Sequence, residues 1–129
     1  MPFSISVHHP GDGRSLYVNA FGAGAVVHRF WHRPANELGL PLLGHLYEDG
    51  VEATGAELAQ LASELSVLES HWHELNLDME PPLDYSITHA DGRTENGTIT
   101  IRAHLHERAA YLKEAIQIAR AQGGVLDIG

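Results

Sequence analysis

Two stretches with apolar residues spaced three and four apart constrain the fold of this chain more than any other feature. The first stretch carries four leucines: Leu58, Leu61, Leu65 and Leu68. This spacing places all four on one face of an α-helix. Thr54 and Glu57 precede them with the T-x-x-E spacing of a capping box, in which each side chain accepts from the other residue's amide. We therefore expect a helix over residues 54–70 that turns its leucines to the core and its carboxylates, Glu64 included, outward.

The second stretch repeats this helical spacing later in the sequence. Its apolar positions are Leu105, Ala109, Leu112, Ile116 and Ala119. Gly123 and Gly124 follow, and glycine readily adopts the left-handed conformation that closes a helix. The pattern predicts a helix over residues 105–122 and then a short strand at 125–128, "VLDI".

Two pairs of segments alternate between apolar and polar residues, as strands with one buried face do. Residues 3–8, "FSISVH", and 15–21, "SLYVNAF", flank a turn signal at 10–13, "PGDG". Residues 84–103, "DYSITHADGRTENGTITIRA", alternate on both sides of a connection rich in turn formers. Each pair predicts a hairpin.

The segment between the first hairpin and the first long helix has no single period. Its apolar residues allow a short helix that begins after Gly24, and Pro34 should end or kink that helix near Arg33. One further turn would be closed by Gly39. We expect residues 40–47, "LPLLGHLY", to form a strand or an extended segment.

The order of these elements is strands, helix, helix, strands, helix and strand, without evident parallel βαβ units. This order predicts an α+β fold in which a mostly antiparallel sheet packs against two main helices, at about 54–70 and 105–122. The 129 residues fit a single α+β domain, 1–129.

The charges of the chain are unevenly distributed. Eight basic residues stand against seventeen acidic ones, and residues 34–92 contain twelve carboxylates but no Lys or Arg. A region with one sign of charge repels nucleic acid and anionic membranes and attracts basic partners. The alternative interpretation is a solvated acidic surface that keeps the protein soluble.

The composition also argues against several classes of protein. No apolar run approaches the ~20 residues of a membrane-spanning helix, and the first residues, "MPFSISVHHPGDG", do not resemble a signal peptide. The absence of cysteine excludes disulfides and thiol catalysis. We therefore expect a cytoplasmic protein that binds neither membranes nor nucleic acid.

Ten histidines raise the question of a metal site. The candidate ligands are His71, His73, His104 and His106, with Glu74 or Glu107 as a further ligand. His28 and His32, at i and i+4, would share one face of a helix. No H-E-x-x-H motif occurs, and histidines at i and i+2 converge on a strand but diverge on a helix. Ordinary surface and half-buried histidines are the alternative.

Catalytic motifs give a weaker signal. The sequence has no G-x-S-x-G motif, and Glu48 and Asp49 lie in an exposed-looking turn, where carboxylates are poor general acids at neutral pH. We expect no enzymatic activity and no cofactor. Trp31 and Trp72 are either core residues or apolar anchors of an interface.

Residues 39–72, "GLPLLGHLYEDGVEATGAELAQLASELSVLESHW", resemble a segment of a bacterial immunity-protein family from polymorphic toxin systems. In that family an apolar P-L-L…L-Y stretch precedes a turn and a helix of the A-x-x-L…E-L type. "EPPLDY" at 80–85 and "YLKEAIQIARAQGGVLDIG" at 111–129 are similar to its proline-containing connection and its closing helix and strand. The resemblance covers residues 15–70 and 105–129. It implies a small cytoplasmic protein that binds and neutralises a cognate secreted toxin.

Charge and resemblance together give the hypothesis of a non-enzymatic acidic protein that neutralises a cognate basic toxin, such as a nuclease. The expected partner-binding residues are Glu48, Asp49, Glu52, Glu57, Glu64, Glu69 and Trp72. One alternative is a metal-binding protein or metal-dependent enzyme that uses the four candidate histidines. Another is a small structural or regulatory domain with no toxin partner. The sequence does not fix the number of copies in the assembly.

Overall fold

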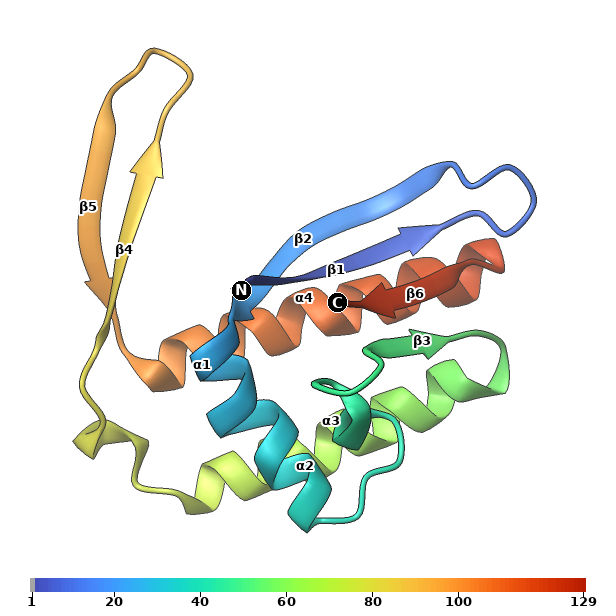
Figure 1. Ribbon diagram of the computed structural model, residues 1–129, viewed down its shortest axis with the longest axis horizontal. Coiled ribbons are helices and arrows are strands. Elements are labelled where there is room, and N and C mark those ends of the chain that lie inside the picture. Colours follow the sequence, from blue (N-terminus) through green and yellow to red (C-terminus); the bar gives the residue numbers. More distant parts are fainter. Residues whose placement is uncertain (1) are drawn as a thin grey trace.

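The strands form two separate antiparallel sheets in the computed structural model, which describes residues 2–129 (Figure 1). The larger sheet has the strand order β2-β1-β6-β3 and consists of β1 (Pro2–His8), β2 (Ser15–Ala23), β3 (Val51–Ala53) and β6 (Val125–Ile128). The smaller sheet is a hairpin of β4 (Leu83–Thr88) and β5 (Thr94–Ile99). Both predicted hairpins and the predicted final strand are confirmed.

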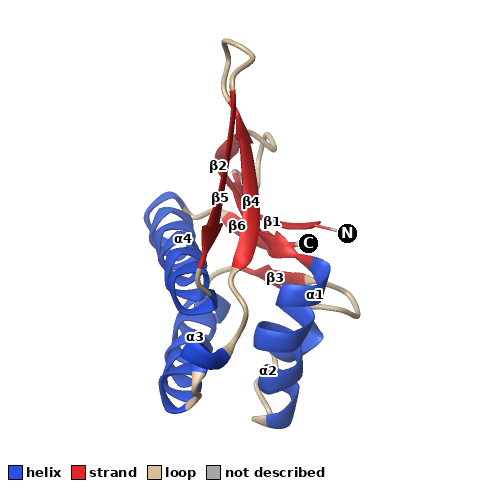
Figure 2. Cartoon of the chain, turned by 90° about the vertical axis from the view of Figure 1, so that its left-hand side faces the viewer, coloured by secondary structure: helices blue, strands red, loops and turns tan. Residues whose placement is uncertain are grey.

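Two long helices cover one face of the larger sheet. α3 (Ala56–Glu74) packs against β3, and α4 (Ile101–Gln122) packs against β1, β2 and β6. Figure 2 shows α3 and α4 side by side. Their apolar stripes form one buried core with inward-facing strand residues such as Ile5, Val7 and Leu126. The predicted α+β fold is confirmed. Among residues 2–129, no helix has both the length and the apolar character required to span a bilayer.

Both helices extend beyond the predicted bounds: α3 ends at Glu74 rather than near residue 70, and α4 begins at Ile101 rather than at residue 105, so that residues 101–103 belong to α4 and not to the predicted hairpin. The ends of the two helices are formed partly as predicted and partly by other means. At the start of α4 the Thr100 hydroxyl accepts from the Ala103 amide at 3.1 Å, and Gly123, with φ 64°, closes the helix as predicted. At α3 only half of the capping box forms. The Glu57 carboxylate accepts from the Thr54 amide at 3.4 Å, while the Glu57 amide donates to the Thr54 carbonyl rather than to its hydroxyl.

Pro34 was expected to end or kink the helix near Arg33, and a continuous helical segment over residues 24–37 excludes the first of these two outcomes. The segment consists of α1 (Gly24–Val27), a π-helical turn (His28–His32) and α2 (Arg33–Glu37). Because proline lacks an amide hydrogen, the carbonyl of Phe30 has no donor at position i+4. The Trp72 indole N–H, from α3, donates to that carbonyl at 2.7 Å instead. The wider turn and this bond allow the segment to pass through the proline.

Residues 40–47 do not form the predicted strand but turns and a short 3₁₀ helix at Leu43–His45. The reason is Glu64, which is only 2% exposed and faces this segment from α3. Its carboxylate accepts from the amides of Leu42 and Leu43 at 3.0 and 2.9 Å, and from Gln60 Nε2 at 3.0 Å. A buried carboxylate thus satisfies amides that a strand would have paired with another strand.

The β4–β5 hairpin stands away from the rest of the protein (Figures 1 and 2). Residues 83–99 are called the arm below. Pro81 and Pro82 precede the arm, and Thr100, the N-cap residue of α4, follows it. Within the arm, the ring of Tyr85 lies over Gly97, where even a Cβ atom would come within 2.5 Å of the Tyr85 hydroxyl. The Tyr85 ring can therefore lie across the neighbouring strand only because residue 97 is a glycine.

Candidate functional site

A row of outward-facing side chains crosses the face of the larger sheet that α3 and α4 leave open. In order across the four strands, the row consists of Val18, Ser6, Asp127 and Glu52. Asp127 and Glu52 are therefore direct neighbours on adjacent strands, where two like charges destabilise the sheet. The His8 Nδ1 atom lies 3.2 Å from the Asp127 carboxylate, but it offsets the repulsion only when His8 is protonated.

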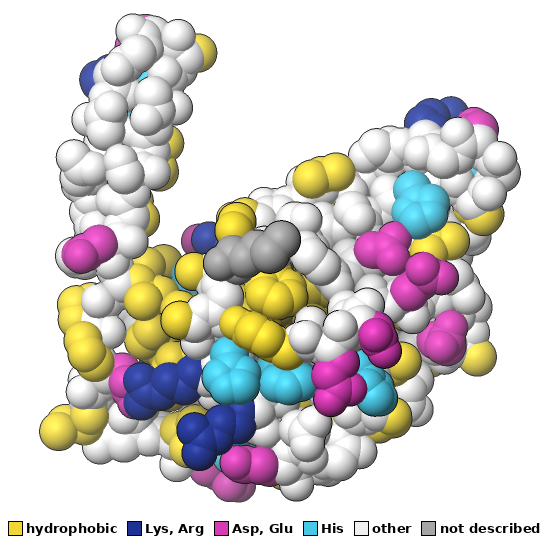
Figure 3. Space-filling view, in the orientation of Figure 1, with side chains coloured by type: hydrophobic (Ala, Val, Ile, Leu, Met, Phe, Trp, Pro, Cys, Tyr) yellow, Lys and Arg dark blue, Asp and Glu magenta, His cyan; other side chains and the backbone are white. Residues whose placement is uncertain are grey.

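This acidic pair borders a hollow of about 540 Å³ beside β3. The apolar side chains that line the hollow are those of Pro2, Phe3, Leu46, Tyr47, Val51 and Ile128. Asp49, Glu52 and Asp127 line its polar side, and the exposed Glu48 precedes Asp49 in the chain. We call Glu48, Asp49, Glu52 and Asp127 the acidic rim. Figure 3 shows acidic side chains gathered next to hydrophobic and histidine side chains on this face.

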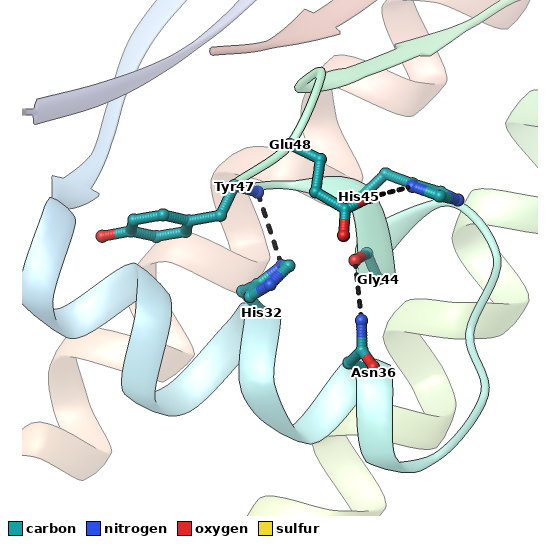
Figure 4. Close-up of polar contacts among 6 residues, drawn as sticks. All are labelled: His32, Asn36, Gly44, His45, Tyr47 and Glu48. Atoms are coloured by element: carbon teal, nitrogen blue, oxygen red, sulfur yellow. Dashed lines mark hydrogen bonds and ion pairs between the residues drawn. The ribbon is translucent and has the colours of Figure 1, made fainter.

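Histidines lie beside the acidic rim, on the π-helical turn and on the turn before β3. The His28 and His32 rings stack with 5.7 Å between centroids, and both lie against the Tyr47 ring, at 4.9 and 5.3 Å. The Tyr47 amide donates to His32 Nδ1 at 3.4 Å, and His45 Nδ1 lies 2.9 Å from the Glu48 carboxylate (Figure 4). Burial, and then the neighbouring His28, lowers the pKa of His32. His32 is therefore neutral at pH 7 and adds no positive charge beside the rim.

The other predicted partner-binding residues lie outside the acidic rim. Glu57 is exposed at the start of α3, and Glu69 is engaged by Lys113 Nζ at 3.0 Å between α3 and α4. The predictions that Glu64 and Trp72 contact a partner are wrong, because both side chains are buried. Glu64 accepts from backbone amides, and Trp72 is 5% exposed and packs against Trp31.

The four candidate metal ligands are divided between two helices. His73 and His106 line one hollow between α3 and α4, together with Glu69 and Glu74. His71 is half-buried on α3, and His104 is buried against Gly22 of β2. Each i, i+2 pair diverges because it lies on a helix. Across residues 2–129, no three His, Cys, Asp or Glu side chains are placed to hold one ion.

His104 gives a testable dependence of stability on pH. It is 7% exposed, and burial, followed by the nearby Arg108, lowers its pKa. As pH falls through about 6.5, the unfolded chain therefore takes up a proton before the folded protein does, and stability falls. We expect this residue to remove up to about 1.4 kcal/mol of unfolding free energy per pH unit in that window.

Urea titrations between neutral and mildly acidic pH measure this slope. His104→Gln should make it shallower, while His106→Gln, which changes an exposed histidine on the same helix, should leave it unchanged. Equal slopes in the wild type and in His104→Gln would contradict the expectation.

The sequence-based predictions did not include Asp127 or the apolar lining of the hollow, to which Phe3 and Tyr47 belong. A signal for Asp127 was available, because the alternation in "VLDI" puts it on the face opposite Leu126 and Ile128. Its place beside Glu52 depends on β6 pairing with β3, which no local pattern indicates.

Comparisons of this chain with protein-family models, with curated proteins and with solved structures find no match. The geometry and the charge of the acidic rim are therefore the features that point to a function.

Proposed function

We propose that this chain is a non-enzymatic binding protein of the immunity type, which neutralises a cognate basic toxin by covering it with the acidic rim. The observation that carries the proposal is the facing pair Glu52 and Asp127. Like charges in this position destabilise a sheet, and a cation of a partner placed between them would remove that repulsion. Within residues 2–129, the ion pairs of Lys and Arg involve other carboxylates: Glu37, Glu69, Asp78, Glu80 and Glu107.

The hollow beside the rim supports a contact in two parts. Lys or Arg of the toxin would pair with the rim, and an apolar side chain next to them would enter the hollow against Phe3 and Tyr47. In such interfaces the desolvated apolar contact supplies most of the affinity, while exposed charges mainly raise the association rate. Inhibition of this kind is stoichiometric and needs no catalytic group.

The proposal predicts that reversing the charge of the rim slows association with a basic toxin. Asp49→Lys combined with Glu52→Lys puts two cations where cations of the partner would bind. We expect the association rate constant to fall by about 10-fold or more and to become less sensitive to salt. The test is to search the reading frame immediately upstream for a toxin domain and to measure its association with this chain by stopped flow. The lack of such a reading frame, or of binding to its product, would contradict the proposal.

A matched control separates the rim from net charge. Glu74→Lys combined with Glu114→Lys changes the formal charge by the same amount at exposed positions outside the rim. This variant should keep most of the wild-type rate. If both double variants slow association equally, the rim has no special role.

A further inference from the structure

Two of the four carboxylates of the acidic rim each lie beside a histidine ring. His8 Nδ1 is 3.2 Å from the Asp127 carboxylate, and His45 Nδ1 is 2.9 Å from that of Glu48. Figure 3 shows histidine side chains next to acidic ones on this face. Histidine is the side chain that ordinarily changes its charge between about pH 5 and pH 8, a range in which carboxylates ordinarily stay ionised. The net charge of the rim can therefore change within that range.

The first pair lies on the open face of the larger sheet. His8 belongs to β1 and Asp127 to β6, and about a third of each side chain is exposed. The residues opposite His8 on the two adjacent strands carry no charge: Ser15 and Val125. The charged residues of the turn after β1 are Asp12, whose carboxylate lies 3.4 Å from His9 Nδ1, and the exposed Arg14. The Asp127 carboxylate is thus the group with which a protonated His8 would pair.

The second pair lies on the turn before β3 (Figure 4). His45 faces Glu48 on its own turn and His32 on the π-helical turn, and Asp49 follows Glu48 in the chain. The His28 ring stacks on that of His32. The arginines of this helical segment form ion pairs with other carboxylates: Arg29 with Glu80 and Arg33 with Glu37. On mild acidification, this end of the rim therefore gains its positive charge from imidazoles.

We propose that these two pairs make the acidic rim a pH-dependent surface, which binds a basic partner at neutral pH and releases it in a mildly acidic medium. An imidazole is ordinarily neutral above about pH 7, which leaves all the rim carboxylates to attract Lys and Arg of the partner. Once protonated, His8 and His45 form charge-assisted hydrogen bonds with Asp127 and Glu48 and compete with the partner for them. This regulation rests on the proposed function, since it acts on the same surface.

Binding of a hexaarginine peptide by the full chain tests the pH dependence without the toxin. Arginine stays charged throughout this range, so any change with pH comes from the protein. Amide shifts of Glu52 and Asp127 in nitrogen–proton correlation spectra report binding at the rim at about pH 7.5 and about pH 6. Each rim charge that an imidazolium offsets should weaken binding about 3-fold, so we expect a dissociation constant about 10-fold higher at the lower pH. The same spectra show that the chain is folded at both pH values.

A matched pair of variants separates the rim histidines from the general loss of negative charge on acidification. His8→Gln combined with His45→Gln removes the two rim imidazoles. His9→Gln combined with His89→Gln removes two imidazoles that pair with carboxylates outside the rim, those of Asp12 and Glu95. Because both variants lose the same number of titrating groups, a difference between them arises from position. On acidification the rim variant should lose only about 2-fold in affinity, and the control about 10-fold, like the wild type.

The possible outcomes distinguish this regulation from the proposed function. Binding that weakens in the control but not in the rim variant supports both. Equal losses in the two double variants, or an equal affinity of the wild type at both pH values, would overturn the pH dependence and leave the proposed function intact. If the peptide shifts no rim amide at about pH 7.5, the rim binds no cation, and the proposed function fails together with its regulation.

Discussion

Replacing Trp72 with alanine is expected to lower the free energy of unfolding by about 4 kcal/mol. The indole is buried and packs edge-on against Trp31, with 4.6 Å between ring centroids, so its removal leaves a cavity in the core. It also leaves the Phe30 carbonyl unpaired, because Pro34 cannot supply the helical donor. Urea denaturation followed by circular dichroism measures the loss. A loss below about 1 kcal/mol would mean that the ring does not hold this part of the core.

A double-mutant cycle isolates the hydrogen bond from the packing. Trp72→Phe retains part of the ring volume but loses the N–H donor, whereas Pro34→Ala restores an amide at position i+4 from Phe30. The loss caused by Trp72→Phe should therefore be smaller, by about 1 kcal/mol, in the Pro34→Ala background. Equal losses in both backgrounds would show that the indole N–H does not compensate for the proline.

Replacing Glu64 with alanine is expected to remove about 3 kcal/mol of stability or more. The carboxylate accepts from the buried amide of Leu43 and from that of Leu42, and alanine leaves both without a partner. Glu64→Gln keeps one acceptor oxygen and should lose less. Amide hydrogen exchange at Leu42 and Leu43 should accelerate together with the loss, since the turn that they begin is no longer held against α3.

The ion pair of Glu69 with Lys113 provides the matched comparison on the same helix. Glu69→Ala removes a partly exposed pair and should cost less than about 1 kcal/mol. A loss for Glu64→Ala as small as that for Glu69→Ala would contradict a structural role for the buried carboxylate.

The two wrong assignments on α3 have a common cause. Glu64 lies three residues after Leu61 and four before Leu68, and Trp72 lies four residues after Leu68. Both positions therefore fall on the leucine stripe, and the helical period alone predicts that they face the core. Glu64 was expected to face outward because it is a carboxylate, and carboxylates are rarely buried unless they are paired. The partners of Glu64 could not be foreseen, since residues 40–47 have no period of their own.

Local patterns predicted the helices and hairpins, while the site depended on relations between distant segments. The stripes of α3 and α4 and the alternation in β1, β4 and β5 each arise within a few turns or residues. The acidic rim instead requires β6 to lie between β1 and β3, which brings Asp127 next to Glu52. The continuation of the helix through Pro34 also depends on a distant segment, because the N–H that pairs with the Phe30 carbonyl comes from Trp72 of α3.

The central position of β6 has a consequence for the biosynthesis of the protein. Residues 125–128 supply the strand that joins β1 to β3, so neither pairing can form on the ribosome before those residues have emerged. Until then the nascent chain can form the β1–β2 hairpin and the arm, but β3 has no neighbour in the sheet. Contacts of such long sequence separation also form slowly. The surface that carries Asp127 and Glu52 is therefore completed only after translation of β6, and a nascent chain is not yet competent to bind through it.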